Sequence, residues 1–352
     1  MPVSLPVLEV TRGRIVESIH YGSIAVVDSD GELIASHGDP QLVAFLRSSA
    51  KPFQALPFVE RGGAEHFGYS LRELSLACAS HMGARIHLDT VAEMQKKVGI
   101  EETDLQCGGH LPADAEMLRE FIRENKKPTN NVNNCSGKHT AMLAYARMRE
   151  EPIGNYLDIK HPIQQDILAA LSEMCGISMD KVELGVDGCS APNFAMPLYN
   201  AALGMARLCD PHDLSEKRAA ACKKITSAMT THPEMISNHG EFDCELMKSG
   251  EGRVVSKRGA EGFQIIGLVP ETPETRGIGI AYKVIDGDAS RINDALESSS
   301  RVRPAVTLEI LRQLNVLNER QLERLTEFGP QKDLINHAGL ITGKSYPVFK
   351  LA

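Results

Sequence analysis

The stretch Asn133-Asn134-Cys135-Ser136-Gly137-Lys138-His139-Thr140 places a thiol, an amine and an imidazole within one turn of chain. An apolar-periodic run follows it over residues 141–148, which predicts that the stretch opens a helix. Cys135 lies three residues before Lys138 and four before His139, so the three side chains share roughly one helix face. Such spacing is typical of a functional site. The alternative is that the polar residues cap a helix and that Cys135 is a small buried hydrophobe.

The chain before this stretch begins with strand patterns and continues with helical ones. Residues 7–10 and 24–28 are predicted strands, and the turn Ser29-Asp30-Gly31 joins the second one to 32–35 as a hairpin. A helix is predicted just after Ser48 and Ser49, with Pro52 in its first turn and one of these serines as its cap. Further helices are predicted at about 84–98 and 113–124.

The chain after this stretch alternates between helices and strands. A strand over 182–186 delivers Asp187 and Cys189, with a helix expected from about 194 to 208. Strands are expected at 263–268 and 277–285, and glycines in the second strand suggest close packing by a helix. Further helices are expected at about 162–174, 214–230, 288–300 and 304–315, and a polar tail follows them. The pattern predicts an α+β or three-layer architecture whose sheet is assembled from distant segments. One catalytic unit is expected, with a weak candidate for a subdomain boundary near Lys126-Lys127-Pro128.

Composition narrows the class of protein and of partner. The 352 residues are 42% hydrophobic and 24% charged, which is ordinary for a globular protein with a sizeable core. The formal net charge of −8 and the absence of Trp argue against a nucleic-acid partner and favour a small-molecule substrate. No stretch approaches the roughly 18 apolar residues of a membrane span.

Cysteine usage predicts a reducing compartment. The eight cysteines are spread along the chain without a C-x-x-C pair, and residues 1–6 lack the features of a signal peptide. We therefore expect free thiols, one or two of them on a metal, in a cytoplasmic protein.

Two groups of residues could carry chemistry. Ser48 and Lys51 lie one helical turn apart, so an enclosed, uncharged Lys51 could serve as the base of a nucleophilic serine. The S-x-x-K spacing alone is weak evidence, because it recurs at Ser178 and Lys181, close to the number expected by chance. Ser80 lies where a short helix gives way to a glycine turn.

The second group is a candidate metal site. Two thiolates, one nitrogen and a water make a plausible zinc site, and Cys135 and Cys189 could supply the sulfurs. On chemical grounds the nitrogen should come from His139, which is neutral near pH 7, with Asp187 as a hydrogen-bond acceptor behind the ligands. The alternative is two unrelated buried cysteines. Other histidines, including His87, are expected to pack in the core or lie at the surface.

Several motifs together resemble one family. The chain contains Arg47-Ser48-Ser49-Ala50-Lys51-Pro52-Phe53-Gln54, Ala79-Ser80-His81, Asn134-Cys135-Ser136-Gly137-Lys138-His139, Val186-Asp187-Gly188-Cys189-Ser190-Ala191-Pro192 and Lys257-Arg258-Gly259-Ala260-Glu261-Gly262. In this order, over nearly the whole chain, they resemble the Rhizobium etli-type L-asparaginases, the class 3 or asparaginase II family. The five blocks together are far more specific than any one of them.

The resemblance implies a homodimer that hydrolyses L-asparagine to L-aspartate and ammonia, with a fold similar to serine β-lactamases and glutaminases. It implies two Ser-Lys pairs in one site, Ser48 with Lys51 and Ser80 with Lys257. It also implies a zinc ion on Cys135, Lys138 and Cys189. The nitrogen ligand is then Lys138 and not His139, and His139 and Asp187 lie next to the ligands. A neutral lysine ligand would depend on the metal to displace its proton.

The resemblance supports a mechanism in which Lys51 deprotonates Ser48, while Ser80 and Lys257 orient the nucleophile and relay protons. Arg47 is a candidate for binding the substrate carboxylate, since a guanidinium grips a carboxylate with two hydrogen bonds, and the alternative is a surface ion pair. Zinc is expected to position the substrate. Other hypotheses remain: an amidohydrolase for glutamine or a cyclic amide, a non-catalytic zinc-stabilised binding module, and a zinc-bound hydroxide as nucleophile.

Overall fold

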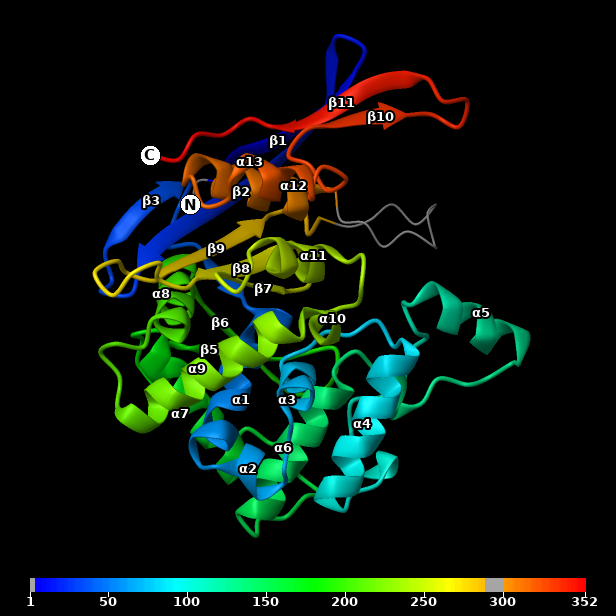
Figure 1. The fold of residues 1–352 in the computed structure, drawn as a ribbon, viewed down its shortest axis with the longest axis vertical. Helices are drawn as coiled ribbons and strands as arrows, with labels where there is room; N and C mark the ends of the chain where they lie inside the picture. Colours follow the sequence, from blue (N-terminus) through cyan, green and yellow to red (C-terminus); the bar gives the residue numbers. More distant parts are fainter. Residues whose placement is uncertain (1–3, 289–300) are drawn as a thin grey trace.

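A computed structural model describes residues 4–288 and 301–352 of the chain. It contains a large antiparallel sheet with helices on both faces and a smaller sheet beside it (Figure 1). The mixed α and β architecture predicted from the sequence is therefore confirmed.

The large sheet joins strands from both ends of the chain. Its order is β10-β11-β1-β2-β9-β8-β7, with β3 paired to β2. The strands are β1 (Leu5–Arg12), β2 (Ile15–Asp28), β3 (Leu33–His37), β7 (Val254–Arg258), β8 (Phe263–Leu268), β9 (Ile278–Val284), β10 (Lys332–Ile335) and β11 (Ile341–Pro347). The hairpin predicted around Ser29-Asp30-Gly31 joins β2 to β3. The expectation that distant segments assemble the sheet is confirmed.

The two faces of this sheet bury separate hydrophobic clusters. On β2, Ile24 and Val26 belong to one cluster and Ala25 and Val27 to the other, because successive strand residues point to opposite faces. The first cluster lies under α12 (Val302–Gln313), and α13 (Glu319–Glu323) lies nearby. The second lies against the larger body of helices. Burial on both faces produces the three layers that the pattern of elements predicts.

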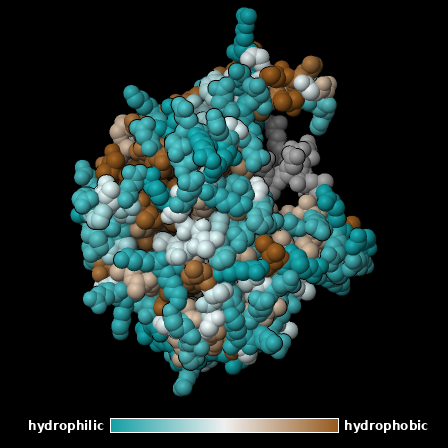
Figure 2. Space-filling view, in the orientation of Figure 1, coloured by the Kyte–Doolittle hydropathy of each residue, from teal (hydrophilic) through white to brown (hydrophobic). Residues whose placement is uncertain are grey.

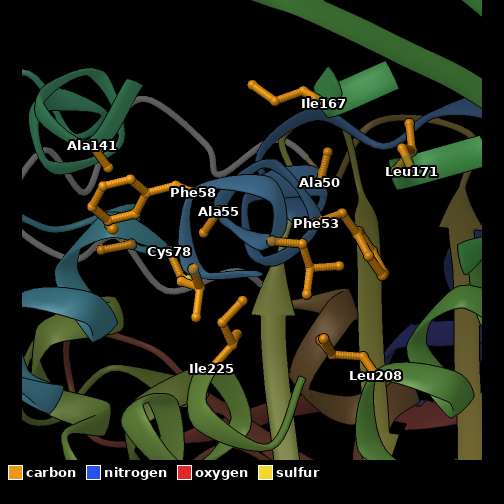
Figure 3. Packing of buried hydrophobic residues seen from close by; sticks show 14 of the residues in the cluster. Ala50, Phe53, Ala55, Phe58, Cys78, Ala141, Ile167, Leu171, Leu208 and Ile225 are labelled. Carbon is orange, nitrogen blue, oxygen red and sulfur yellow. The ribbon is translucent and has the colours of Figure 1, made fainter. Parts of the chain in front are cut away.

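The helix α1 (Lys51–Glu60) is buried within the larger helical body. The other helices of this body are α2 (Gly63–His66), α3 (Leu71–Ala77), α4 (Arg85–Val98), α5 (Ala115–Arg123), α6 (Ser136–Met148), α7 (Pro162–Met174), α8 (Leu198–Cys209), α9 (Glu216–Thr231), α10 (Pro233–Ile236) and α11 (Phe242–Ser249). Residues 51–59 of α1 are all buried. Phe53 and Phe58 extend from α1 into the surrounding apolar side chains (Figure 3). The enclosure of α1 buries Lys51 with it.

A glycine lets α8 approach the sheet closely. A Cβ atom on Gly279 of β9 would lie 1.8 Å from the Ala202 carbonyl oxygen of α8, so no larger residue fits this position without a shift. This confirms the close packing predicted from the glycines of this strand.

Individual elements differ from the expectations at three places. The helix expected from 194 begins at Leu198, because residues 192–197 form β6 (Pro192–Pro197), the buried central strand of a sheet with β4 (Val43–Phe45) and β5 (Glu183–Val186). The polar tail contains two strands that were not predicted: β11 pairs with β1, and β10 pairs with β11 at the end of the large sheet. Neither Ser48 nor Ser49 caps α1, whose N-cap is Ala50 without a side-chain hydrogen bond. The helix predicted at 288–300 falls almost entirely outside the described residues.

The surface in the view of Figure 2 is mostly hydrophilic. An apolar area at its upper right lies over the turn between β10 and β11, where Ile335, Leu340 and Ile341 are exposed. Within residues 4–288 and 301–352, no helix combines the length and apolar character that a bilayer crossing requires.

Candidate active site

The turn before α1 connects the first motif to the last one. Residues 47–50 form a short 3-10 turn, and Lys51 follows as the first residue of α1. Ser49 Oγ donates a hydrogen bond to the main-chain oxygen of Lys257 at 2.8 Å, which joins this turn to β7. Ser48 is half-buried. In the described part of the chain its hydroxyl makes no hydrogen bond to Lys51.

Ser80 lies between two buried lysines. Its Oγ is 3.0 Å from Lys51 Nζ and 2.8 Å from Lys257 Nζ. Lys51 starts α1, Ser80 follows the end of α3, and Lys257 belongs to β7, so three distant segments meet here. Ser80 is only 4% exposed, and its main-chain N–H donates to the Ile236 carbonyl at 2.9 Å. The structure thus brings together Lys51, Ser80 and Lys257 in one buried cluster.

Lys257 is placed to be an uncharged amine. Burial and the neighbouring Lys51 hold the pKa of Lys257 well below the usual lysine value, with Arg258 adding to the effect. Asp243 and Cys135 oppose it. An amine with a lowered pKa can accept a proton near neutral pH, which is what a base beside a serine hydroxyl requires.

The predicted metal ligands also converge. Cys135 is the N-cap of α6, Lys138 lies in the first turn of α6, and Cys189 lies in the turn between β5 and β6. Lys138 Nζ is 3.1 Å from Cys189 Sγ. Asn134 connects this group to the lysine cluster, because its carbonyl oxygen accepts from Lys51 Nζ at 3.4 Å. The two groups of residues are therefore neighbours.

The pKa values of the two thiols and of Lys138 depend on one another. A hydrogen bond from Cys189 holds the pKa of Cys135 well below its usual value, although burial opposes this. The same bond raises the pKa of Cys189. For Lys138, burial acts to lower the pKa, but the two sulfurs raise it above its ordinary value.

The residue types of the predicted ligands are those that a zinc ion prefers. Two thiols and a nitrogen are zinc's preferred ligands, and His139 offers a further nitrogen beside them. Among the described residues, His139 Nε2 is a buried atom without a hydrogen-bond partner, while its Nδ1 lies 2.6 Å from Tyr156 Oη. No group of three or more His, Cys, Asp or Glu side chains in the described ranges is spaced to hold a metal. The predicted set contains only two such side chains besides its lysine.

Arg47 and Asp187 form an ion pair next to the thiols. Arg47 Nε donates to Asp187 Oδ1 at 2.7 Å, and both side chains are partly buried. Burial alone would raise the pKa of Asp187, but the bond from Arg47 brings it below its usual value. Asp187 therefore holds the guanidinium in place from one side.

Three residues other than glycine have left-handed backbone angles in the motif segments. The φ values are 51° for Arg47, 69° for Ser190 and 59° for Glu261. Such angles cost energy in residues with a Cβ, and they tend to be retained where a site requires them. Each lies within a motif segment that contributes side chains to one of the two neighbouring groups of the site.

Sequence reasoning missed several contacts of this site. It paired each serine with one lysine and did not anticipate that Ser80 touches both. It also missed Tyr156, which contacts His139, and Asp243, which faces Lys257 from α11. No local pattern marks these residues, because their partners lie on other elements.

A buried histidine next to the site predicts how stability depends on pH. His87 Nδ1 accepts from the Ala84 N–H at 3.1 Å, and Nε2 donates to the Glu234 carbonyl at 3.0 Å, which fixes the neutral imidazole. Burial lowers the pKa of His87 from 6.5 to about 4. The unfolded chain therefore binds this proton first, so stability present above pH 6.5 falls as the pH drops toward 4.

We expect this histidine to account for about 3 kcal/mol of the decrease in unfolding free energy between pH 7.5 and pH 4. In His87→Gln, a glutamine can accept from the same N–H without titrating. The free energy of unfolding, measured with denaturant at pH 7.5 and pH 4, should then fall by about 3 kcal/mol less than in the wild type. The exposed His66→Gln is the control and should match the wild type. An equal acid loss in the wild type and His87→Gln would contradict the assignment.

Comparisons with known proteins show to which family the chain belongs. A glutaminase from Bacillus subtilis shares 12% sequence identity at a TM-score of 0.39, over 84% of this chain and 88% of that one. A protein named Mglu shares 14% at 0.44, over 84% and 67%, and a β-lactamase from Burkholderia ambifaria shares 13% at 0.38, over 83% and 95%. These distant likenesses support no statement about activity. No curated protein sequence matches the chain. A family model described as L-asparaginase II matches residues 8–346, and the chain belongs to the L-asparaginase II family.

Proposed function

We propose that this protein is an L-asparaginase that hydrolyses L-asparagine to L-aspartate and ammonia. The observation that carries the proposal is the contact of Ser80 with both Lys51 and Lys257 in a buried cluster. Membership of the L-asparaginase II family supports an amidohydrolase acting on a small amide. The lowered pKa of Lys257 supports proton transfer at neutral pH.

In the proposed reaction, Lys51 as an uncharged amine takes the proton of Ser48, and Ser48 Oγ attacks the side-chain amide carbon. The carbon–nitrogen bond then breaks, and the nitrogen leaves as ammonia with a proton returned by the site. Water attacks the acyl-serine and releases aspartate. Ser80, in contact with both amines, passes the proton between Lys51 and Lys257. Catalytic hydrogen bonds often tighten only with substrate present, so the Ser48 to Lys51 contact is expected to form then.

Arg47 is proposed to bind the α-carboxylate of the substrate. Its Nε is held by Asp187 at 2.7 Å, which orients the planar guanidinium next to the motif that contains Ser48. A guanidinium fixed in this way can offer its remaining N–H groups to a carboxylate with little loss of side-chain freedom.

Cys135, Lys138 and Cys189 are proposed to hold a zinc ion, with His139 and Asp187 flanking them. When bound, zinc would supply positive charge that positions the substrate. The protein side chains described above carry the proton transfers.

A zinc-binding measurement tests this ligand set without reference to activity. We expect one zinc per chain in the wild type and a loss of affinity on the order of 10²–10³-fold in Cys189→Ala, which is roughly one ligand's share of a structural zinc site. Equilibrium dialysis with metal analysis measures the affinity. Cys222→Ala, another buried cysteine on α9, is the control and should bind zinc as the wild type does. Equal affinity in all three proteins would contradict the site.

The same measurement separates the two candidate nitrogen ligands. His139→Gln should weaken zinc binding by about tenfold, as removal of a group next to the ligands does. Lys138→Met should weaken it as strongly as Cys189→Ala. The reverse order would identify His139 as the ligand in place of Lys138.

The proposed function is tested by mass spectrometry of protein quenched during turnover of asparagine. We expect ammonia release from asparagine and an aspartyl adduct on the peptide that contains Ser48. An adduct on Ser80 would exchange the roles of the two serines. Ammonia from glutamine alone would indicate a glutaminase, and no turnover of either amide would support a non-catalytic module. Turnover without any adduct would favour a zinc-bound hydroxide as nucleophile.

We further propose a cytoplasmic homodimer of the Rhizobium etli type, with one catalytic unit per chain. The supporting observation is the occurrence of the five motifs in order along the chain. Size-exclusion chromatography with light scattering would test the dimer.

A further inference from the structure

Asp243 is a buried carboxylate that the proposed reaction does not use. It lies in the first turn of α11 and is 2% exposed. Its Oδ1 accepts from Ser256 Oγ at 2.7 Å and from Gln264 Nε2 at 2.9 Å, and its Oδ2 accepts from the Arg258 N–H at 2.9 Å. Burying a carboxylate costs free energy unless its oxygens accept hydrogen bonds, and these three donors offset that cost for Asp243.

The donors to Asp243 surround Lys257 in the sheet. Ser256 and Arg258 are its two chain neighbours on β7, and Gln264 is the register partner of Arg258 on β8. Lys257 Nζ in turn donates to the Arg258 carbonyl at 3.0 Å. The main chain of Arg258 is thus held by Asp243 at its N–H and by Lys257 at its carbonyl. Movement of this segment would displace Lys257 Nζ from Ser80.

The position of β7 explains why such a support is needed. In the described part of the sheet β7 is the terminal strand, paired only with β8. A terminal strand has main-chain groups without a strand partner on its outer edge. Asp243 supplies an acceptor for one of them, and α11 covers the edge at this point.

Charges face Lys257 from several elements. Lys51 of α1 and Arg258 of β7 lower the pKa of Lys257, while Asp243 of α11 and Cys135 at the start of α6 raise it, with Asp243 the stronger of these two. The thiol of Cys78, at the end of α3, is also near, and burial raises its pKa to about 12, so it is neutral. Burial alone would raise the pKa of Asp243, but Lys257 and Arg258 bring it below its usual value. Asp243 is therefore a carboxylate at neutral pH.

We propose that Asp243 is a positioning residue for the Ser80 and Lys257 pair. It binds the Arg258 main-chain N–H on one side of Lys257 and the Ser256 hydroxyl on the other, and it places a fixed negative charge near the Lys257 amine. The kinetic tests of this inference rest on the proposed function, because they measure the hydrolysis of asparagine. The inference assigns to α11 a role beyond covering the sheet edge.

The charge is tested with Asp243→Asn, which keeps the size of the side chain. Loss of the negative charge makes a protonated Lys257 less favourable, so the acid limb of kcat/KM for asparagine should move to lower pH by about one unit. The rate at the optimum should also fall. A merely structural role would reduce the rate at every pH and leave the limb in place. Glu245→Gln, which removes a charge from the same helix, is the matched control and should leave both unchanged.

The positioning role is tested with Ser256→Ala, which removes one donor and no charge. We expect kcat to fall about tenfold, with little change in KM and the acid limb in place, because a hydrogen bond worth about 1.4 kcal/mol to the geometry is lost. If Asp243→Asn folds and the acid limb of its kcat/KM profile stays at the wild-type pH, the inference is overturned. If Asp243→Asn does not fold, wild-type kinetics in Ser256→Ala overturns it.

A second readout separates this inference from the proposed function. The ¹³Cε resonance of Lys257, assigned by its absence in Lys257→Met, follows the titration of the amine without substrate. Its midpoint should move to lower pH in Asp243→Asn and stay in place in Glu245→Gln. A wild type that does not hydrolyse asparagine would contradict the proposed function, while an unmoved midpoint would contradict the role of Asp243.

Discussion

Replacing Lys257 by methionine should reduce turnover of asparagine by at least about 10³-fold, the range of a lost general base or proton relay. Lys257 Nζ lies 2.8 Å from Ser80 Oγ, and methionine has similar length but cannot accept or donate that proton. The loss should appear in kcat rather than in KM, because Lys257 contacts the serine and is not proposed to bind the substrate. Steady-state ammonia release measures both constants.

The same substitution should lower the stability only moderately. A thioether does not carry the cost of burying an amine, but it leaves the Arg258 carbonyl and the buried Asp243 carboxylate without the amine beside them. The unfolding free energy of Lys257→Met should therefore fall by about 1–3 kcal/mol, with the fold retained. Lys248→Met, on α11 and paired with Glu245, is the control and should keep full activity. Activity above one tenth of the wild type in Lys257→Met would contradict the proposed role.

Replacing Lys51 by methionine should be at least as damaging, with a loss of about 10⁴-fold expected in kcat. Lys51 Nζ contacts Ser80 Oγ, the Ala79 carbonyl and the Asn134 carbonyl, so it joins the serine cluster to the segment that carries the thiols. Loss of this amine removes the proposed base and these three contacts together.

Stability and zinc content separate the two roles of Lys51. A melting temperature close to that of the wild type, with zinc content unchanged, would indicate loss of the base alone. Full activity in Lys51→Met would mean that another group deprotonates the nucleophile. Comparison with Lys257→Met shows whether the two amines act as a unit, since the double variant should then be no slower than the single ones.

The members of the candidate site could be proposed from the sequence because they lie in short motifs. The octapeptide around Cys135 opens α6 as its apolar periodicity predicts, and the strand before Cys189 is β5. The spacing of Ser48 and Lys51 is a local property of one helix start. These features follow from near neighbours in the chain, so a single sequence can reveal them.

Other features could not be predicted because they depend on contacts between distant segments. β6 is a strand rather than a helix because it is paired on both sides by β4 and β5. The last strands form because β1 offers an edge to β11, and β11 in turn pairs with β10. Pairing of this kind outweighs local propensity. The sequence likewise gave no reason to place Asp243 next to Lys257.

The sequence by itself determined which residues could do chemistry and the mixed α and β architecture, because residue type, spacing and hydrophobic period are local. Only the tertiary structure decided that Ser80 meets both lysines and that Asp243 supports one of them. The physical reason is burial: the enclosure that lowers the pKa of Lys257 exists only when α1, α3, α11 and β7 pack around it.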